Sequence, residues 1–416
     1  MKLSTLKLHI TVIAILFLAG CYAENQTEEA STKVKVGAEI LIEKYLPDLE
    51  GKRVGLVMNP TARINGTHML DTLLERNVDV TALFSPEHGF RGDRGAGEKI
   101  EDGIDQKTGL PVYSLYGKTR KPTAEMLKNT DILLFDIQDV GARFYTYNAT
   151  LGNIIEAATE FGIKVWVLDR PNPAGGYVGG WILEEPFTSF VGAYPIPVAH
   201  GMTLGELGQM MIAENWLDLA GTPEYRVIEM EGWKHDMLWG DTKLPWIPPS
   251  PNLPEFKNAY AYLGTAFFEG TTLSEGRGTR SPFLILGDPN FSYHDATMQA
   301  LAETYGVQID SLSFTPKAMP GKAPNPDHEG VLCYGVEISI PDIRQFTDPV
   351  SFGLDLMAAM LKATPEADTI SFLYKLAGTK DKITQFIEQS SPKPGDLWHD
   401  QAAKFKEKRE PYLLYP

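Results

Sequence analysis

Short, nearly uninterrupted apolar runs separated by helix-like stretches constrain the fold of this chain more than any other feature. Five such runs lie in the first half of the sequence, at residues 53–59, 78–84, 111–115, 131–136 and 163–168. Strands of a parallel sheet are buried on both faces, so they consist of continuous apolar residues rather than alternating ones. The stretches 67–76 and 147–161 have the length and spacing of helices. Residues 51–170 therefore predict an α/β fold, a Rossmann-like doubly wound parallel sheet with helices on both faces.

The character of the sequence changes from about residue 204. Short strands, aromatic clusters and proline-rich turns dominate, as in the run WIPPSPNLP at residues 246–254. Helical patterns in this half are expected at residues 204–215, 294–304 and 349–362. We predict a Rossmann-like domain over residues 37–203 and a smaller α+β domain over residues 204–416.

The first 36 residues are typical of a secreted lipoprotein. Lys2 and Lys7 precede an apolar run at residues 10–19, which is too short to span a bilayer. The run ends in LAGC at residues 18–21, which resembles the site where a signal peptide is cut before a lipidated cysteine. We predict a signal peptide over residues 1–20, a lipid on Cys21, a flexible polar tether over residues 21–36 and a location at the cell envelope. The alternative is an ordinary signal peptide followed by a chance cysteine.

Charge and cysteine content exclude several classes of protein. The formal net charge is −16, and removing residues 1–20, which hold two lysines and no acidic residue, makes it −18. A body this acidic is a poor candidate for binding nucleic acid through a basic patch. Lipidation of Cys21 would leave Cys333 without a disulfide partner. Cys333 lies in a strand-like apolar run, which predicts a small buried side chain rather than a nucleophile.

The usual cofactor and metal motifs are missing from the sequence. The first strand is followed by NPTAR at residues 59–63 instead of the glycine-rich turn that cradles a dinucleotide. Pro60 even removes one backbone N–H donor from this turn. The sequence has no His-Glu-x-x-His motif, no cysteine cluster and no Gly-x-Ser-x-Gly elbow. We therefore expect neither a cofactor nor a metal ion.

Polar residues gather where four of the five predicted strands end. They are Asn59, the run SPEHG at residues 85–89, the run 136–143 and the run DRPN at residues 169–172. In a doubly wound sheet, ligands bind outside the carboxyl ends of the strands, so these side chains are expected to meet at one rim. Helix capping, for which Asp and Asn are well suited, is the alternative.

Two further polar clusters lie later in the chain. His200 lies in a loop rich in proline and glycine, and residues 268–279 combine glycines and hydroxyls with Glu269, Glu275 and Arg277. A solvated turn is the alternative for this second run. Carboxylates accompanied by Arg, Asn, Gln and aromatic residues suit sugar chemistry, in which one carboxylic acid protonates the glycosidic oxygen and a second carboxylate assists.

Five long motifs, in this order, resemble one known family. They are FSPEHGFRG at 84–92, DIQDVGARFYT at 136–146, LDRPNPAGG at 168–176, LPWIPPSPN at 244–252 and FEGTTLSEGRGT at 268–279. Together they are similar to the NamZ-type exo-β-N-acetylmuramidases, glycoside hydrolase family 171. The resemblance implies an active site in the cleft between the two domains. It also implies a peptidoglycan-derived saccharide as substrate, with removal of terminal N-acetylmuramic acid from non-reducing ends.

The resemblance also suggests roles for individual residues. Glu87 is the expected general acid, and Glu269 or Glu275 the second carboxylate, with Asp136 and Asp139 as rivals. Arginines are expected at the lactyl carboxylate of the substrate, the candidates being Arg143, Arg170 and Arg277. The remaining binding candidates are Asn59, His88, Asp136, Gln138, Asp139, Asp169 and His200. Two other functions stay open, a noncatalytic lipoprotein that binds muropeptides and a metal-dependent envelope hydrolase.

Overall fold

The computed structural model describes residues 33–87, 89, 102–389 and 394–416. Residues Val34–Pro416 form one compact unit. The expected signal peptide, Cys21 and most of the expected tether lie outside the described residues. The end of that tether belongs to the body, however, because Val34 is buried and its amide donates to the Thr242 carbonyl at 3.1 Å. No helix in the described part of the chain is long and apolar enough to cross a membrane.

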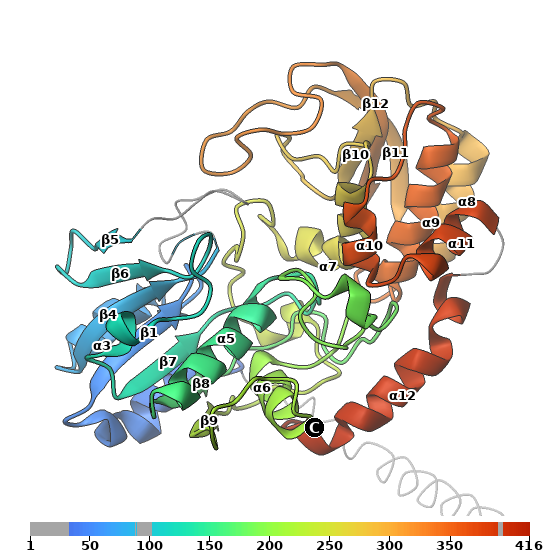
Figure 1. Ribbon diagram of the computed structural model, residues 1–416. Helices are drawn as coiled ribbons and strands as arrows, with labels where there is room; N and C mark the ends of the chain where they lie inside the picture. The colour runs from blue at the N-terminus through green and yellow to red at the C-terminus, as the bar shows by residue number, and fades with distance from the viewer. Residues whose placement is uncertain (1–32, 88, 90–101, 390–393) are drawn as a thin grey trace, which may run out of the picture. The chain divides into compact units, whose positions relative to one another are not determined.

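A seven-stranded sheet forms the centre of the first half of the body (Figure 1). Its strands, in spatial order, are β5 (Gly103–Ile104), β6 (Pro111–Ser114), β4 (Asp79–Ser85), β1 (Arg53–Met58), β7 (Ile132–Asp136), β8 (Lys164–Leu168) and β9 (Tyr225–Ile228). All neighbours pair in parallel except the short edge strand β5, which runs antiparallel to β6. The five strands predicted from apolar runs are all present, and the prediction of a doubly wound parallel sheet is confirmed.

The order of the six parallel strands is that of a Rossmann fold. Counted along the chain they lie in the order 3-2-1-4-5-6, with the reversal between β1 and β7. The sixth is β9, which pairs with β8 in register from Val165–Tyr225 to Leu168–Ile228. The sheet therefore continues past the boundary expected at residues 203 and 204. Its last strand was not apparent in the sequence because it is a short, half-exposed edge strand that carries Arg226.

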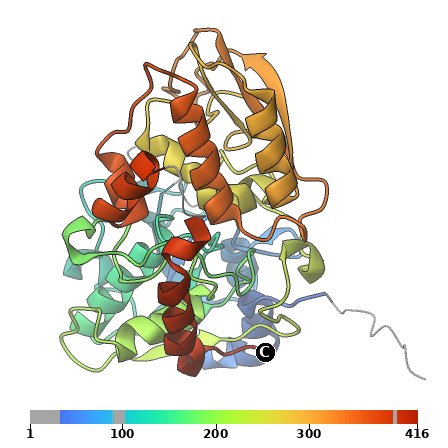
Figure 2. The same cartoon turned by 90° about the vertical axis from the view of Figure 1, so that its right-hand side faces the viewer.

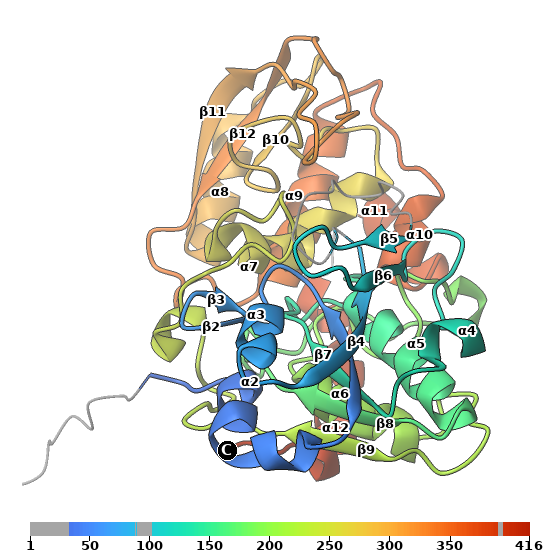
Figure 3. The same cartoon turned by 90° about the vertical axis from the view of Figure 1, so that its left-hand side faces the viewer.

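Helices cover both faces of this sheet, as Figures 1 and 3 show. On one face lie α5 (Tyr147–Glu160) and α6 (Leu204–Ala213), and on the other α2 (Gly37–Ile40) and α3 (Met69–Leu74). Alternate residues of β7 serve the two layers, since Leu133 and Phe135 pack toward α5, and Ile132 and Leu134 toward α2 and α3. A further single turn, α4 (Ala124–Leu127), precedes β7, and a two-stranded ribbon, β2 (Arg63–Ile64) and β3 (Thr67–His68), precedes α3.

The second half of the body contains a smaller antiparallel sheet in the order β10 (Ile285–Asp288), β12 (Cys333–Ser339) and β11 (Gln308–Phe314). Cys333 is fully buried there, as predicted. The main helices of this half are α7 (Phe256–Thr265), α8 (Asp295–Tyr305) and α9 (Pro349–Lys362). Shorter helices, α10 (Phe372–Ala377) and α11 (Asp381–Gln389), follow. The apolar cluster around α5 continues without a break into α7 and α9, so the two halves share one core.

The chain finally returns to the first half (Figure 2). Helix α12 (His399–Arg409) is followed by a tail whose residue Tyr415 packs against Trp233 and Met230. Residues past the expected boundary thus complete the Rossmann-like half at two places, in β9 and at the C-terminus.

Candidate active site

One cavity of about 480 Å³ is lined by both halves of the chain. The first half contributes Glu87, Tyr116 and Thr146 to its lining, and the second half adds Glu269, Glu275 and Arg277. Aromatic and apolar residues complete the lining, together with Arg120, Ser250, Asn325 and Asp327. Small-molecule sites commonly have volumes of about 300–1,000 Å³, so this cavity has room for a sugar. All three predicted catalytic glutamates and one predicted arginine therefore meet in the same place.

Glu87 is held by contacts to its side chain and to its backbone. It follows β4, and the Thr146 hydroxyl at the start of α5 donates to its Oε2 at 2.9 Å. Tyr116, which follows β6, lines the cavity beside Glu87; burial raises the pKa of Tyr116 and the Glu87 charge raises it further. Tyr147 donates to the Glu87 backbone carbonyl at 3.3 Å. These hydroxyl donors fix the direction in which the carboxyl group points.

Arg277 joins the two other glutamates. Its Nη2 donates to Glu269 at 2.9 Å and its Nη1 to Glu275 at 2.8 Å. The loop that carries Glu275 and Arg277 depends on Gly276 and Gly278, whose φ angles are +84° and +78°. A Cβ atom on Gly276 would also lie 2.1 Å from the Ile285 carbonyl oxygen. The glycines seen in the sequence therefore shape a loop that presents charged side chains to the cavity.

The charges of this cluster influence one another strongly. Burial raises the pKa of Glu269, the nearby Glu275 and Glu87 charges raise it further, and Arg277 opposes the shift. The pKa of Arg277 is raised, because Glu269 and Glu275 outweigh the effect of its own burial. Burial raises the pKa of Asp327 as well, with Glu275 adding to the shift. A carboxyl group that keeps its proton more readily, close to others that ionise, is suited to acid–base catalysis.

The polar residues at the reversal point of the sheet do not line the cavity, contrary to expectation. Arg170 forms a buried ion pair with Asp136, and Gln138 donates to the carbonyls of Asp139 and Pro171. Oδ1 of Asn59 accepts from the Thr61 amide. A space lined by Asp139 and Arg170 measures about 10 Å³, room for a single water. Arg170 and Asp136 thus pair with each other, and Gln138 and Asn59 bind neighbouring backbone groups. Their observed contacts serve the fold, where substrate contacts had been predicted.

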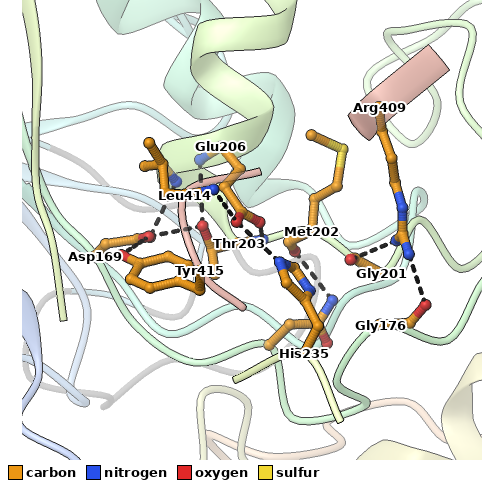
Figure 4. Close-up of polar contacts among 12 residues, drawn as sticks. Asp169, Gly176, Gly201, Met202, Thr203, Glu206, His235, Arg409, Leu414 and Tyr415 are labelled. Carbon is orange, nitrogen blue, oxygen red and sulfur yellow. Dashed lines mark hydrogen bonds and ion pairs between the residues drawn. The ribbon is translucent and has the colours of Figure 1, made fainter. Parts of the chain in front are cut away.

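Asp169 and Arg409 belong to a buried network that fastens the C-terminal tail (Figure 4), and His200 contacts the same network. Asp169 accepts hydrogen bonds from the hydroxyls of Thr203 at 2.6 Å and Tyr415 at 2.7 Å. The backbone carbonyl of His200 accepts from Arg409 at 2.7 Å, and its Nδ1 accepts from the Met202 amide. Burial, aided by the Arg409 charge, lowers the pKa of His200 to about 3, so its ring is neutral. The side chains of Asp169 and His200 do not line the cavity.

Arg143 is completely buried and donates to three backbone carbonyls, those of Trp181, Ile196 and Leu376. Burial alone lowers its pKa to about 9. The predicted contact with a substrate carboxylate is therefore replaced by a structural one, which ties the loop after β7 to α10. Of the other predicted binding residues, His88 lies outside the described residues.

Several lining residues were not predicted. Tyr116 directly follows the predicted strand at residues 111–115 and lines the cavity. The expectation that ligands bind at the carboxyl ends of the strands therefore also points to Tyr116. Thr146 is the last residue of the DIQDVGARFYT motif. Arg120, Phe190 and Asp327 lie in loops that carry no comparable signal.

Fold and site together define a class of protein. Carboxyl groups from both halves of a two-part α/β body surround one cavity of sugar size, with hydroxyl and aromatic groups beside them. This is the arrangement of a glycoside hydrolase.

Comparison with known proteins gives the particular family. The N-terminal model of exo-β-N-acetylmuramidase NamZ matches residues 54–257 and the C-terminal model matches residues 260–415. The chain therefore belongs to the NamZ family. The boundary between the two family models, at residues 257–260, falls after β9. This agrees with the position of β9 in the sheet of the first half.

Similar proteins include the peptidoglycan β-N-acetylmuramidase NamZ of Bacillus subtilis strain 168. It is 41% identical over 406 residues, covering 94% of this chain and 94% of that protein. Crystal structures of two DUF1343 family proteins from Bacteroides fragilis, 38% and 33% identical, each superpose with a TM-score of 0.80. Each comparison covers 92% of this chain and 99% of the other.

Proposed function

We propose that this protein is an exo-acting glycoside hydrolase that removes terminal N-acetylmuramic acid from the non-reducing ends of peptidoglycan fragments. The observation that carries the proposal is the meeting of Glu87, Glu269 and Glu275 in one cavity. The 41% identity to a peptidoglycan β-N-acetylmuramidase, over nearly the full length of both chains, supports the same substrate.

Within this proposal the glutamates have separate tasks. Glu87 is the general acid, held by hydroxyl donors at the end of β4, and Glu269 is the second carboxylate. Both Glu269 and Glu275 pair with Arg277, but Glu269 keeps about a fifth of its side-chain surface exposed, whereas Glu275 keeps 4%. Glu275 therefore positions Arg277, which in turn balances the charge of Glu269.

The test is incubation of the purified protein with a disaccharide of N-acetylmuramic acid linked to N-acetylglucosamine, followed by mass analysis. Release of both monosaccharides is expected. A longer fragment ending in N-acetylmuramic acid should lose that one sugar, and a fragment ending in N-acetylglucosamine should stay intact. Cleavage inside the longer fragment would contradict exo action, and saturable binding without turnover would establish the noncatalytic alternative.

We also propose that the mature protein is anchored to the cell envelope through a lipid on Cys21. The support is the lysine-flanked apolar run and the LAGC sequence at residues 18–21. Mass analysis of the mature protein from a bacterial host should find an acylated N-terminal Cys21. Cys21→Ser should move the protein out of the membrane fraction. Cleavage at another position, with no acyl group, would refute the anchor.

A further inference from the structure

The proposed substrate raises an electrostatic problem in this cavity. N-acetylmuramic acid differs from N-acetylglucosamine by a lactyl ether, which adds one carboxylate. The described residues that line the cavity include four acidic side chains, those of Glu87, Glu269, Glu275 and Asp327, and only two cationic ones, those of Arg120 and Arg277. A substrate carboxylate would be repelled by such a site unless it lay beside a cation whose charge is still available.

Arg277 is not that cation. Both of its terminal nitrogens already donate to carboxylates, Nη2 to Glu269 and Nη1 to Glu275. Its guanidinium group also lies over the ring of Phe283, with its carbon 5.0 Å from the ring centre. The two other arginines expected at the lactyl group, Arg143 and Arg170, are buried away from the cavity.

Arg120 has the properties that the other three lack. It lies on the loop after β6, its side chain is exposed, and it lines the cavity. Within the described part of the chain, no carboxylate is paired with it. Its guanidinium group stacks over the Phe190 ring, with its carbon 4.3 Å from the ring centre. Stacking holds the group in place and leaves the N–H donors at its edge free for a ligand.

Tyr116 relates Arg120 to the catalytic end of the cavity. Burial raises the pKa of Tyr116, the Glu87 charge adds to the shift, and the Arg120 charge opposes it. The charges of Glu87 and Arg120 therefore both act on the Tyr116 hydroxyl. The Tyr116 ring lies 6.2 Å from that of Phe190, centre to centre. Arg120 and Glu87 consequently border the same part of the cavity, as one bound sugar requires.

We propose that Arg120 binds the lactyl carboxylate of N-acetylmuramic acid and so determines the preference for this sugar over N-acetylglucosamine. The inference rests on the proposed function for the identity of the substrate. A guanidinium group can donate two parallel hydrogen bonds to a carboxylate, a geometry that lysine cannot reproduce.

The test measures the binding of the two free sugars, N-acetylmuramic acid and N-acetylglucosamine, by calorimetry. The wild-type protein should bind the muramic acid more tightly. Arg120→Ala should weaken that binding by about 10–100-fold, as expected for the loss of hydrogen bonds to a charged group, and leave the binding of N-acetylglucosamine unchanged. Arg120→Lys should recover only part of the loss. The matched control is Lys118→Ala, which removes an exposed cation from the same loop but outside the cavity lining.

Two results would overturn the assignment. One is equal binding of both sugars by the wild-type protein, and the other is unchanged discrimination in Arg120→Ala. Hydrolysis of the disaccharide is measured separately, so that failure of the Arg120 assignment can be distinguished from failure of the proposed catalytic function. Arg120-dependent binding without hydrolysis would refute the catalytic proposal alone, whereas hydrolysis by Arg120→Ala with unchanged kcat/KM would refute the role of Arg120 alone.

Discussion

The hydroxyl group of Thr146 donates a hydrogen bond of 2.9 Å to Oε2 of Glu87, although the two residues are 59 positions apart. Thr146 is the N-cap residue of α5, yet its side chain makes no capping bond to that helix. Among the described residues, Glu87 is therefore the only hydrogen-bond acceptor that we observe for this hydroxyl. This bond orients the proposed general acid without contributing to the start of the helix.

Replacing Thr146 should consequently affect catalysis and not folding. Thr146→Val keeps the shape of the side chain and removes the donor, so kcat for the disaccharide should fall about tenfold, because the Glu87 carboxyl group loses a hydrogen bond that fixes its direction. Thr159→Val removes a hydroxyl from the same helix that donates only to the Ile155 carbonyl, and its kcat should be unchanged. Equal kcat values for both variants would contradict the positioning role.

The roles of Glu87 and Glu269 can be separated by the leaving group of the substrate. A good leaving group departs without protonation, so Glu87→Gln should lose activity on the disaccharide by at least about 100-fold and retain much of it on a dinitrophenyl muramide. Glu269→Gln should lose activity on both substrates. The reverse pattern would make Glu269 the general acid, a role that its raised pKa would also suit.

Arg277 should prove necessary for stability as well as for activity. Arg277→Met leaves Glu269 and Glu275 buried together without a counter-charge, and breaking such a pair costs about 3–5 kcal/mol. Arg277→Met combined with Glu275→Gln removes one of the two stranded charges, so chemical denaturation should show a smaller loss for the double variant. A double variant less stable than Arg277→Met would contradict the assignment of mutual charge balance.

The stability contributed by Asp169 should depend on pH with a defined sign. Burial raises its pKa to about 7, although the hydroxyls of Thr203 and Tyr415 oppose the shift. A carboxyl group whose pKa is raised by folding stabilises the protein most at low pH, and this stability is lost as the pH rises from the ordinary Asp pKa of about 4 to about 7. Asp169→Asn should therefore gain stability relative to wild type between pH 5 and pH 8, on the order of 2 kcal/mol.

Asp131→Asn provides the control for this measurement. The hydrogen bonds from Arg53 lower the pKa of Asp131 to about 2, so its contribution changes only in strong acid. The difference in unfolding free energy between Asp131→Asn and wild type should be the same at pH 5 and pH 8. A constant difference for Asp169→Asn as well would show that Asp169 is ionised throughout this range.

Arg143 should matter for stability without affecting substrate affinity. Arg143→Met would leave three buried carbonyls without their donor, which should lower the free energy of unfolding by about 3 kcal/mol. KM for a muramide should stay at the wild-type value. A raised KM with unchanged stability would restore the original prediction that Arg143 contacts substrate. Arg344→Met, which removes an exposed arginine paired with Asp241, should change neither quantity.

The amino-acid sequence by itself determined five strands of the central sheet and pointed to three glutamates as site candidates. The run predicted at residues 163–168 became β8 within one residue, because a strand buried on both faces must be apolar throughout. Glu269 and Glu275 could be singled out because their segment, residues 268–279, combines glycines, hydroxyls and carboxylates, a composition typical of close approach to a ligand. Both features are local, so the local sequence carries them.

The tertiary structure decided which polar residues serve the site and which serve the fold. In the sequence, Arg143 and Arg170 stand out because they follow predicted strands, whereas Arg120 lies in a loop without such a signal. Arg143 became structural through a contact with Leu376, 233 positions away, and Arg170 through an ion pair with Asp136. Arg120 keeps its charge available for a ligand because no carboxylate in the described part of the chain is paired with it. Such pairings depend on contacts between distant segments, and only the folded chain brings those segments together.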